Sequence, residues 1–325
     1  MRVLVLTNMY PHEADPSFGT FVYEQVRALR ALGVDIDVLF VNGRASRRNY
    51  LIGYLRLWRQ LCHVRYDLIH AHYVFAGWIA RAQGRLPVVQ SFHGAGEMLG
   101  YQGWLCKRLA PLVDRVIVTS ADHKARLSYA PARIIPCGVD LALFAPQPRE
   151  EARRKLGWEP GKKTVLWVGD PRPEKRLDLV HGAFDLLAQR RGDAAGLPVE
   201  LKIVSRVPHA EVPTYMSAAH AFILPSDHEG SPVVIKEAMA CNLPVVAVDV
   251  GDVAQVIGGV EGCYLAERTA KDLADKLEQA LNHEQSAGRA AIQHLQTSAE
   301  AQAILDMYNE LIGVSPQRHR DTKAE

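Results

Sequence analysis

Two glutamates, Glu229 and Glu237, are separated by seven residues in a stretch that suits an anion site. A strand-like run at 221–224 precedes them and an apolar helical run at 238–241 follows, so we expect Glu229 on a loop and Glu237 about two turns into a helix. The start of that helix would offer free N–H groups and the positive end of the helix dipole, which together hold an anion such as a diphosphate. Because carboxylates can accept hydrogen bonds from sugar hydroxyls, the segment predicts a site for a sugar attached to a nucleotide diphosphate.

Three residues between the glutamates fit the same site. Pro232 suits the first helical position, because its missing N–H would have no intrahelical partner there. Gly230 would let a ligand approach the backbone closely, and Ser231 lies between the two. The alternative is the start of a buried helix that happens to carry two acids.

The segment from Glu229, with Glu-Gly-Ser-Pro followed by Glu-Ala-Met-Ala-Cys and Pro-Val-Val-Ala, resembles the signature of retaining glycosyltransferases with the GT-B fold, family 4 type. The resemblance extends from Thr7 to about Leu281. It implies a nucleotide-diphosphate sugar as co-substrate, no cofactor and no catalytic metal. It also implies a same-face mechanism, in which a donor phosphate oxygen accepts the acceptor's proton, with Glu229, His93 and Lys175 as the catalytic residues.

The loop that begins at Gly169 would supply cations for the diphosphate. Lys175 aligns with a lysine of the family, but Asp170 stands where the family has an arginine, so Arg172 or Arg176 would supply the second cation. Cations held there would stabilise the negative charge that the leaving diphosphate gains. The alternative is a solvated loop between a strand and a helix.

Further candidates follow other predicted strands. His93 precedes a glycine-rich loop, and the resemblance places it near the donor sugar; Gly19 stands where the family has a glycine near the donor phosphate and the acceptor. Ser205 would border the nucleotide base. A structural histidine and plain loop residues are the alternatives. His70 and His72 lack an evident third ligand, so no metal site is predicted.

The chain has 325 residues, of which 48% are apolar, enough for two domains with sizeable cores. Its five cysteines are odd in number and widely spaced, which indicates a reducing compartment rather than a disulfide framework. The first apolar run is too short for a signal peptide, and no apolar stretch reaches the roughly 20 residues that span a bilayer. We therefore expect a cytoplasmic protein.

Short apolar strands alternate with helical patterns, which indicates βαβ units and parallel sheets. We expect strands at 3–6, 36–40, 68–70, 88–91, 116–119, 134–136, 164–168, 199–203, 221–224, 245–247 and 262–265. In the first half we expect helices at 20–32, 49–64, 75–83 and 121–127. The pattern predicts the α/β class, with two Rossmann-like, doubly wound domains that face a central cleft.

We place the acceptor domain at 1–144, the donor domain at 145–296 and a frayed tail at 314–325. The proline- and charge-rich stretch 145–151 reads as the linker between the two domains. The resemblance further implies that the last helix, about 297–313, crosses back to the first domain.

Charge is uneven along the chain. Residues 1–150 carry 18 Lys and Arg against 11 Asp and Glu, whereas residues 151–325 carry 20 against 25. The basic first half suits a phosphate-bearing acceptor or an anionic membrane surface. The segment Arg44–Tyr66 reads as a basic amphipathic helix for the inner face of a membrane, or as a core-facing helix with a solvated back. Nucleic acid is not expected, because no binding motif accompanies the charge.

The resemblance implies retaining transfer of a sugar to a glycan, polysaccharide or lipid-linked acceptor, in cell-surface polysaccharide or glycolipid biosynthesis. One alternative is a sugar-nucleotide epimerase or hydrolase of the same fold. The other is a catalytically degenerate homologue that binds a glycan or a partner, which the departure at Asp170 favours. A dinucleotide-dependent oxidoreductase is disfavoured, because no G-x-G-x-x-G follows a strand.

Overall fold

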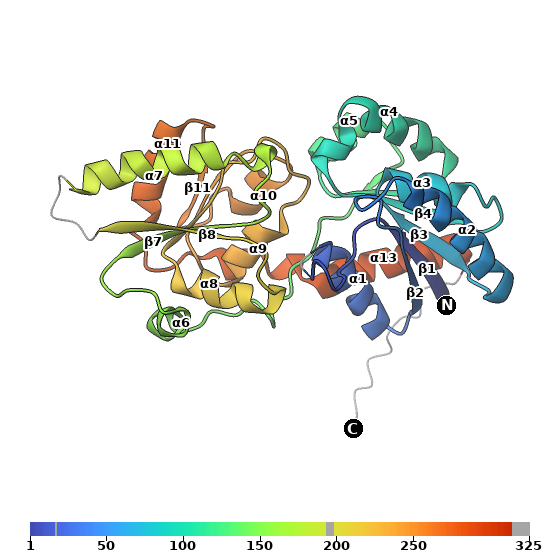
Figure 1. The fold of residues 1–325 in the computed structure, drawn as a ribbon, viewed down its shortest axis with the longest axis horizontal. Coiled ribbons are helices and arrows are strands. Elements are labelled where there is room, and N and C mark those ends of the chain that lie inside the picture. The colour runs from blue at the N-terminus through green and yellow to red at the C-terminus, as the bar shows by residue number, and fades with distance from the viewer. Residues whose placement is uncertain (17, 193–197, 314–325) are drawn as a thin grey trace, which may run out of the picture.

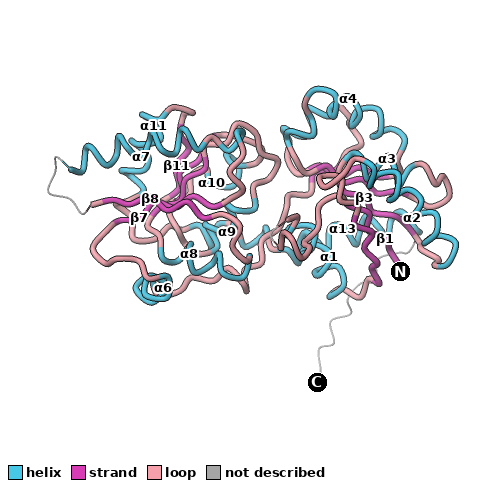
Figure 2. The backbone as a smooth tube through the Cα atoms, in the orientation of Figure 1, coloured by secondary structure: helices cyan, strands magenta, loops and turns pink. Residues whose placement is uncertain are grey.

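The computed structural model describes residues 1–16, 18–192 and 198–313. These residues form two parallel sheets, each covered by helices on both faces, and the two resulting lobes lie side by side (Figures 1 and 2). The predicted α/β class with two doubly wound domains is therefore confirmed.

The first sheet has the strand order β2-β1-β3-β4-β5-β6, and its neighbouring strands pair in parallel. Each strand falls on one of the runs predicted from the sequence, and the observed ends differ from the predicted ones by at most two residues. The strands are β1 (Arg2–Thr7), β2 (Asp35–Phe40), β3 (Leu68–His72), β4 (Val88–Phe92), β5 (Arg115–Val118) and β6 (Arg133–Ile134).

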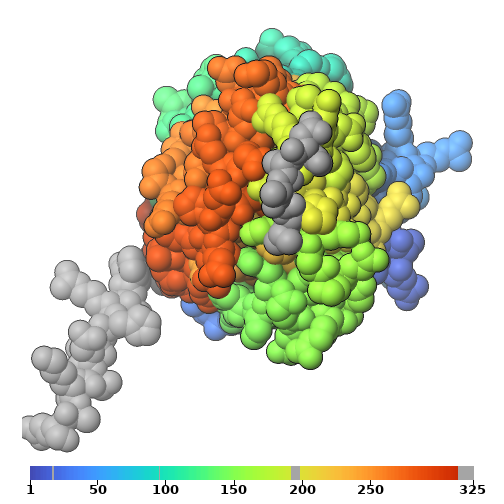
Figure 3. All heavy atoms as spheres, turned by 90° about the vertical axis from the view of Figure 1, so that its left-hand side faces the viewer, coloured from blue at the N-terminus to red at the C-terminus, as the bar shows by residue number. Residues whose placement is uncertain are grey.

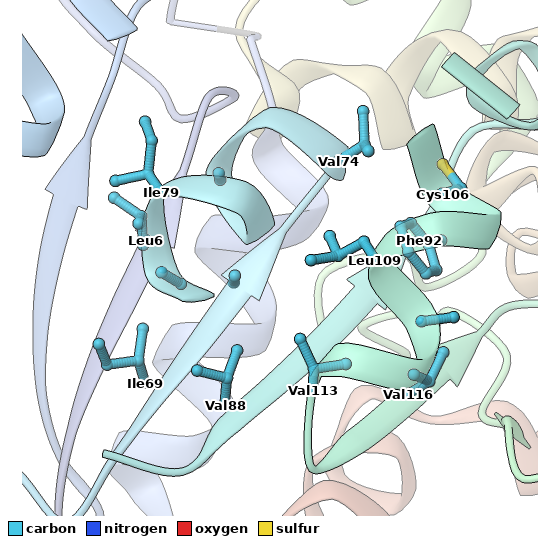
Figure 4. Close-up of a cluster of buried hydrophobic side chains, with 14 of the residues drawn as sticks. Leu6, Ile69, Val74, Ile79, Val88, Phe92, Cys106, Leu109, Val113 and Val116 are labelled. Atoms are coloured by element: carbon cyan, nitrogen blue, oxygen red, sulfur yellow. The ribbon is translucent and has the colours of Figure 1, made fainter. Parts of the chain in front are cut away.

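Helices cover both faces of this sheet, because each carries one apolar stripe that packs on the strands. One buried cluster lies between the sheet and α2 (Arg48–His63), α3 (Val74–Arg81), α4 (Gly100–Leu109) and α5 (Ala121–Leu127). Figure 4 shows part of it, where side chains from the strands meet those of α3 and α4. The other cluster lies between the sheet and α1 (Thr20–Ala31) and α13 (Thr297–Ile312). Two short 3₁₀ turns, Ala95–Met98 and Ala110–Leu112, flank α4.

The second sheet has the strand order β11-β10-β9-β7-β8, also in parallel. Its strands are β7 (Lys163–Val168), β8 (Val199–Val204), β9 (Ala221–Leu224), β10 (Val245–Val248) and β11 (Cys263–Ala266). Its helices are α6 (Arg149–Leu156), α7 (Leu177–Gly192), α8 (Val212–Ala218), α9 (Val233–Ala240), α10 (Val253–Ile257), α11 (Ala270–Ala280) and α12 (Gly288–Ala291). Short 3₁₀ turns lie at Pro173–Lys175, His209–Glu211 and Gln293–Leu295. Figure 3 looks onto the end of this domain, where α7 and α11 lie side by side.

Within the described residues, the chain crosses between the domains twice. Val139, Leu141 and Phe144 already pack in the core of the second domain, so the chain enters that core a few residues before the predicted boundary at residue 144. It returns at α13, whose residues Ala301, Ile304, Met307 and Tyr308 are buried against the first sheet beside α1 (Figure 1). The predicted tail, 314–325, lies outside the described residues.

Candidate functional site

The carboxyl ends of the two sheets meet around the loop that carries Glu229 and Gly230. A Cβ atom on Gly230 would collide with the carbonyl oxygen of His93 and would lie 2.5 Å from Cε1 of His123 and 2.7 Å from Oγ1 of Thr119. All three of these residues belong to the first domain. We predicted that Gly230 lets a ligand approach the backbone; the structure adds a second reason for glycine, because backbone and side-chain atoms of the first domain fill this space.

Lys175 and Glu229 form a close ion pair on the second-domain side of the site. Nζ of Lys175 lies 2.5 Å from Oε1 of Glu229, and the two side chains are 14% and 13% exposed. Lys175 ends the turn after β7, and Glu229 lies on the loop between β9 and α9. The ends of two neighbouring strands thus bring together residues 54 positions apart. A cation and a carboxylate that remain partly open to solvent can each exchange this partner for a ligand.

The other cations of the Gly169–Arg176 loop have acidic partners nearby. Arg172 is 51% exposed and lies 3.1 Å from Glu174 and 3.7 Å from Asp170. Arg176 is bound to Asp178 and Asp227, which raises the pKa of its guanidinium. Arg172 is therefore the more exposed of the two candidates for the second cation.

Asp170 also contacts the first domain. Its carboxylate lies 3.8 Å from the guanidinium of Arg44, which follows β2. The residue that replaces the arginine of the family pattern thus contributes a polar contact between the two domains.

Helix α9 begins one residue later than predicted. Pro232 has extended backbone angles (φ −67°, ψ 105°) and precedes the first helical residue, Val233. Glu237 is consequently the fifth helical residue, in the second turn rather than two turns in. The first turn of a helix leaves N–H groups without intrahelical partners, so the start of α9 keeps the donors and the dipole that an anion requires.

Glu237 points to a histidine of its own domain. Oε1 of Glu237 lies 2.7 Å from Nε2 of His209, and the Glu237 residue is 6% exposed. Burial acts to lower the pKa of His209, but the hydrogen bond and the charge of Glu237 outweigh it and the pKa is raised. His209 also packs on Phe144, which comes from the segment that crosses between the domains.

The side chain of Ser231 is fully engaged inside the protein. Its hydroxyl donates to Oδ2 of Asp252 at 2.6 Å and accepts from Nζ of Lys236 at 2.5 Å and from the N–H of Cys137 at 3.3 Å. Ser231 therefore offers a ligand its backbone rather than its hydroxyl. The pattern of the sequence did not indicate this arrangement, although a lysine within an apolar helix is an unusual feature.

His93 is buried at the end of β4, next to a second histidine. Its Nε2 lies 2.8 Å from Nδ1 of His72, and its Nδ1 is buried without a hydrogen-bond partner among the described residues. Burial, reinforced by His72, lowers the pKa of His93 well below its usual value. A neutral imidazole whose second ring nitrogen has no protein partner can donate to or accept from a hydroxyl group.

Glu97 fixes the loop that carries His93, and sequence reasoning missed it as a structural residue. Its carboxyl group accepts hydrogen bonds from the N–H groups of Val74 and His93. Burial raises the pKa of Glu97 to about 8, although these N–H groups act to lower it. The carboxyl group thereby ties the start of α3 to the end of β4.

The remaining candidates differ in how they are placed. Gly19 precedes α1 with φ 72°, and a Cβ there would lie 2.5 Å from the carbonyl carbon of Met9, so the turn itself requires glycine. Gly169 follows β7, and its Cβ position lies 3.2 Å from the ring of Trp167. Ser205 follows β8 with a buried hydroxyl that has no partner among the described residues.

Metal binding and membrane crossing were the two remaining features to place in the structure. Among the described residues, no group of three or more His, Cys, Asp or Glu side chains could hold a metal ion. No helix in the described part of the chain combines the length and the apolar character needed to cross a membrane.

Two family models match this chain in succession. The model "Glycosyltransferase Family 4" matches residues 18–143, and the model "Glycosyl transferases group 1" matches residues 148–294. The break between the matched segments falls in the predicted linker.

Two curated relatives match most of the chain. TuaC of Bacillus subtilis, which bears the name of a teichuronic acid biosynthesis glycosyltransferase, is 26% identical over 88% of this chain and 90% of its own length. A D-inositol 3-phosphate glycosyltransferase of Mycobacterium marinum is 29% identical over 76% of this chain and 64% of its own length.

Solved structures share the fold. A sucrose-phosphate synthase of Thermosynechococcus elongatus has a TM-score of 0.79 at 21% identity and covers 97% of this chain and 99% of its own. HepE of Anabaena in complex with UDP has a TM-score of 0.70 at 18% identity and covers 95% of this chain and 100% of its own.

Proposed function

Because this chain belongs to the glycosyltransferases of the GT-B fold, family 4 type, we propose that it moves a sugar from a nucleotide-diphosphate sugar to a glycan, polysaccharide or lipid-linked acceptor. The transfer would retain the anomeric configuration and proceed without a metal or other cofactor. HepE, a protein of the same fold, is solved with UDP and with UDP-glucose, which supports a nucleotide-sugar donor. TuaC, named for teichuronic acid biosynthesis, supports a place in cell-surface polysaccharide or glycolipid biosynthesis.

The observation that carries this proposal is the Lys175–Glu229 pair beside the start of α9. The N–H groups of the first turn would bind the diphosphate, and Lys175 would exchange Glu229 for a phosphate oxygen. Arg172, half exposed on the same loop, would supply the second cation. Glu229, released from the lysine, would accept hydrogen bonds from the hydroxyls of the sugar.

In the reaction itself, the bond between the anomeric carbon and the diphosphate oxygen breaks, and a bond from that carbon to the acceptor oxygen forms on the same face. The proton of the acceptor hydroxyl passes to the departing phosphate oxygen, so no side chain needs to act as the base. Lys175 and the dipole of α9 stabilise the charge that grows on the diphosphate. His93, held neutral by burial, would orient the sugar from the opposite domain.

The first domain would meet the acceptor and an anionic membrane surface through α2. This helix buries Gly53 and Leu57 toward the core, whereas Leu51 and Leu55 are 66% and 60% exposed. Its segment, Arg44–Tyr66, carries six arginines and no acidic residue. Exposed leucines among arginines suit the interface of an anionic bilayer, which would bring the enzyme to a lipid-linked acceptor from the cytoplasmic side.

A ligand panel tests the donor. A ligand that binds the folded state raises its stability by RT ln(1 + [L]/Kd), about 2.7 kcal/mol at a hundredfold excess over Kd. We expect UDP-, GDP- or ADP-sugars to raise the melting temperature of the wild-type protein, with one base preferred. If none of these donors shifts the melting temperature or is consumed in the presence of glycan and lipid-linked acceptors, the proposed function is wrong.

The same panel tests Glu237 as a donor ligand. We expect Glu237→Ala to weaken donor binding or turnover by roughly tenfold to a hundredfold, because a buried hydrogen bond contributes about 1–3 kcal/mol. Glu211→Ala is the matched control, since it removes an exposed glutamate two residues after His209. Unchanged donor binding and turnover in a folded Glu237→Ala protein would remove Glu237 from the site.

A further inference from the structure

Lys236 is an ammonium buried completely at the boundary between the two domains. It lies on α9 with 0% of its surface exposed, next to Glu237. A buried charge persists only where acceptors replace the water that it has lost. Nζ of Lys236 has three acceptors: Oγ of Ser231 at 2.5 Å, the carbonyl oxygen of Cys137 at 2.7 Å and Oδ2 of Asp252 at 3.0 Å.

These acceptors come from three separate parts of the chain. Ser231 belongs to the loop before α9, and Asp252 precedes α10. Cys137 lies 99 residues before Lys236, on the segment that leaves the first sheet after β6. Both backbone polar groups of Cys137 are hydrogen-bonded, because its carbonyl accepts from Lys236 and its N–H donates to Ser231. The ammonium therefore links the loop between β9 and α9, here called the donor loop, to the segment that leaves the first domain.

The segment after Cys137 forms one half of the connection between the domains. Val139 pairs in parallel with Gln296 of the returning segment, through hydrogen bonds from Val139 N–H to Leu295 and from Thr297 N–H to Val139. A Cβ on Gly138 would lie 2.6 Å from Cα of Thr297, so the two crossings are in direct contact. A change in the angle between the domains has to pass through this short ribbon, and Lys236 holds its first residue.

The same contacts set the position of the donor loop. Ser231, held by Lys236 and Cys137, follows Gly230, whose backbone lies directly against His93 and Thr119 of the first domain. Gly251, one residue before Asp252, packs on the other side of this loop, since its Cβ position lies 2.9 Å from the carbonyl oxygen of Glu229. The loop is thus enclosed between the Lys236 network and the first domain.

We propose that Lys236 is a positioning residue, which holds the two domains at the angle that places Glu229 and the start of α9 opposite His93. Without its ammonium, the Cys137 carbonyl loses its donor and the ribbon is free to turn away from α9. The effect on catalysis rests on the proposed sugar transfer, whereas the effect on the domain angle does not.

Distances between spin labels on the two domains test this proposal without any substrate. Cys62 on α2 is exposed, whereas Cys106, Cys137, Cys241 and Cys263 are buried, so Cys62 can carry the first label. Lys271→Cys on α11, at a side chain that is 81% exposed, provides the second. In the double-labelled wild-type background we expect one narrow distance distribution by pulsed electron resonance.

Two variants and one matched control are compared in this background. Lys236→Met leaves Asp252 as an unpaired buried charge, so Lys236→Met combined with Asp252→Asn gives a neutral pair that restores folding. Arg153→Met is the control: it also removes a buried cation, but the contacts of Arg153 with Thr164 and Ala218 lie within the second domain.

We expect the double variant to regain most of the melting temperature lost in Lys236→Met and still to show a broader or shifted distance distribution. Arg153→Met should lower the melting temperature and keep the wild-type distribution. With a donor that the wild type uses, the double variant should lose about tenfold in kcat/KM. A double variant that keeps the wild-type distance distribution would overturn the proposal, whatever donor the protein uses. If the distance distribution changes but the protein uses no nucleotide sugar, the positioning role of Lys236 is supported and only the proposed function is wrong.

Discussion

At Gly230 a hydrogen atom is the largest side chain for which the opposite domain leaves room. The carbonyl oxygen of His93 belongs to the backbone, so it cannot avoid an added methyl group by a change of rotamer. The sequence marks this glycine clearly, through its place beside Glu229, but the reason for it depends on a residue of the other domain. A glycine in a binding motif can thus serve the contact between domains as well as the contact with a ligand.

We therefore predict that Gly230→Ala separates the two domains locally. A methyl group forced into a packed site costs about 1–3 kcal/mol, and a loss of 1.4 kcal/mol in the transition state is about tenfold in rate. We expect kcat/KM for the donor to fall about tenfold or more, as measured by product formation at low donor concentration.

Gly96→Ala is the matched control for this change. Gly96 lies three residues after His93, and no heavy atom would lie within 4 Å of its added Cβ. Its kcat/KM should stay near the wild-type value. Equal kinetics for Gly230→Ala and the wild type would contradict the domain contact that we describe.

At the scale of single elements, the apolar pattern of α2 predicts the helix but not what its exposed side contacts. The pattern predicts a helix at 49–64, and the structure has Arg48–His63. The sequence left two interpretations open, a core-facing helix and a membrane-facing helix. In the structure one side of α2 faces the core, where Leu57 is buried, while Leu51, Ile52 and Leu55 are exposed on the other side, so contact with a membrane stays a prediction.

Replacement of two exposed leucines of α2 tests the membrane surface. We expect Leu51→Ser with Leu55→Ser to lower binding to vesicles with anionic lipids by tenfold or more, because each leucine contributes about 1.5–3 kcal/mol when fully buried. Co-sedimentation with anionic and with neutral vesicles measures the effect, and added salt should weaken the wild-type binding.

Leu265→Ser is the control for replacing an exposed leucine by serine, because Leu265 is 38% exposed and lies on the second domain. Its vesicle binding should equal that of the wild type. If the α2 double variant binds anionic vesicles as strongly as the wild type, α2 is not the membrane-binding surface.

At the scale of the whole molecule, the buried histidines make the fold sensitive to acid. Burial lowers the pKa of His70 to about 3, of His123 to about 4 and of His220 to about 3, and it lowers those of His72 and His93 well below 6.5. Below about pH 6.5 the unfolded chain takes up these protons and the folded protein does not. Stability therefore falls as the pH falls, by about 1.4 kcal/mol per pH unit for each such group.

Four groups with raised pKa values do not add to this loss of stability in acid. Glu97, with a pKa raised to about 8, and Glu24 and Glu300, with raised pKa values, stabilise the folded protein on acidification, because it holds their protons more tightly than the unfolded chain does. The raised pKa of His209 contributes stability that is constant below 6.5 and is lost at higher pH. Since five histidines oppose three glutamates, the net effect is a loss of stability in acid.

We predict that the melting temperature falls between pH 7 and pH 5 at constant ionic strength, as followed by circular dichroism. His123→Gln should reduce the change of the free energy of unfolding with pH, between pH 6.5 and pH 4, by the contribution of one proton, about 1.4 kcal/mol per pH unit. A melting temperature that stays constant over this range would show that the buried histidines do not govern the acid response.

The sequence by itself determined the order of the strands along the chain and the α/β class, because hydrophobic periodicity is a local property, but it did not predict helix α4. It also assigned Glu229, Lys175 and His93 to loops after strands, and parallel strands bring such loops to one edge. The tertiary structure decided which side chains meet there. Lys236 and Cys137 are 99 positions apart, and Lys175 and Glu229 are 54 apart, so their contacts depend on the packing of whole domains, which no local pattern encodes.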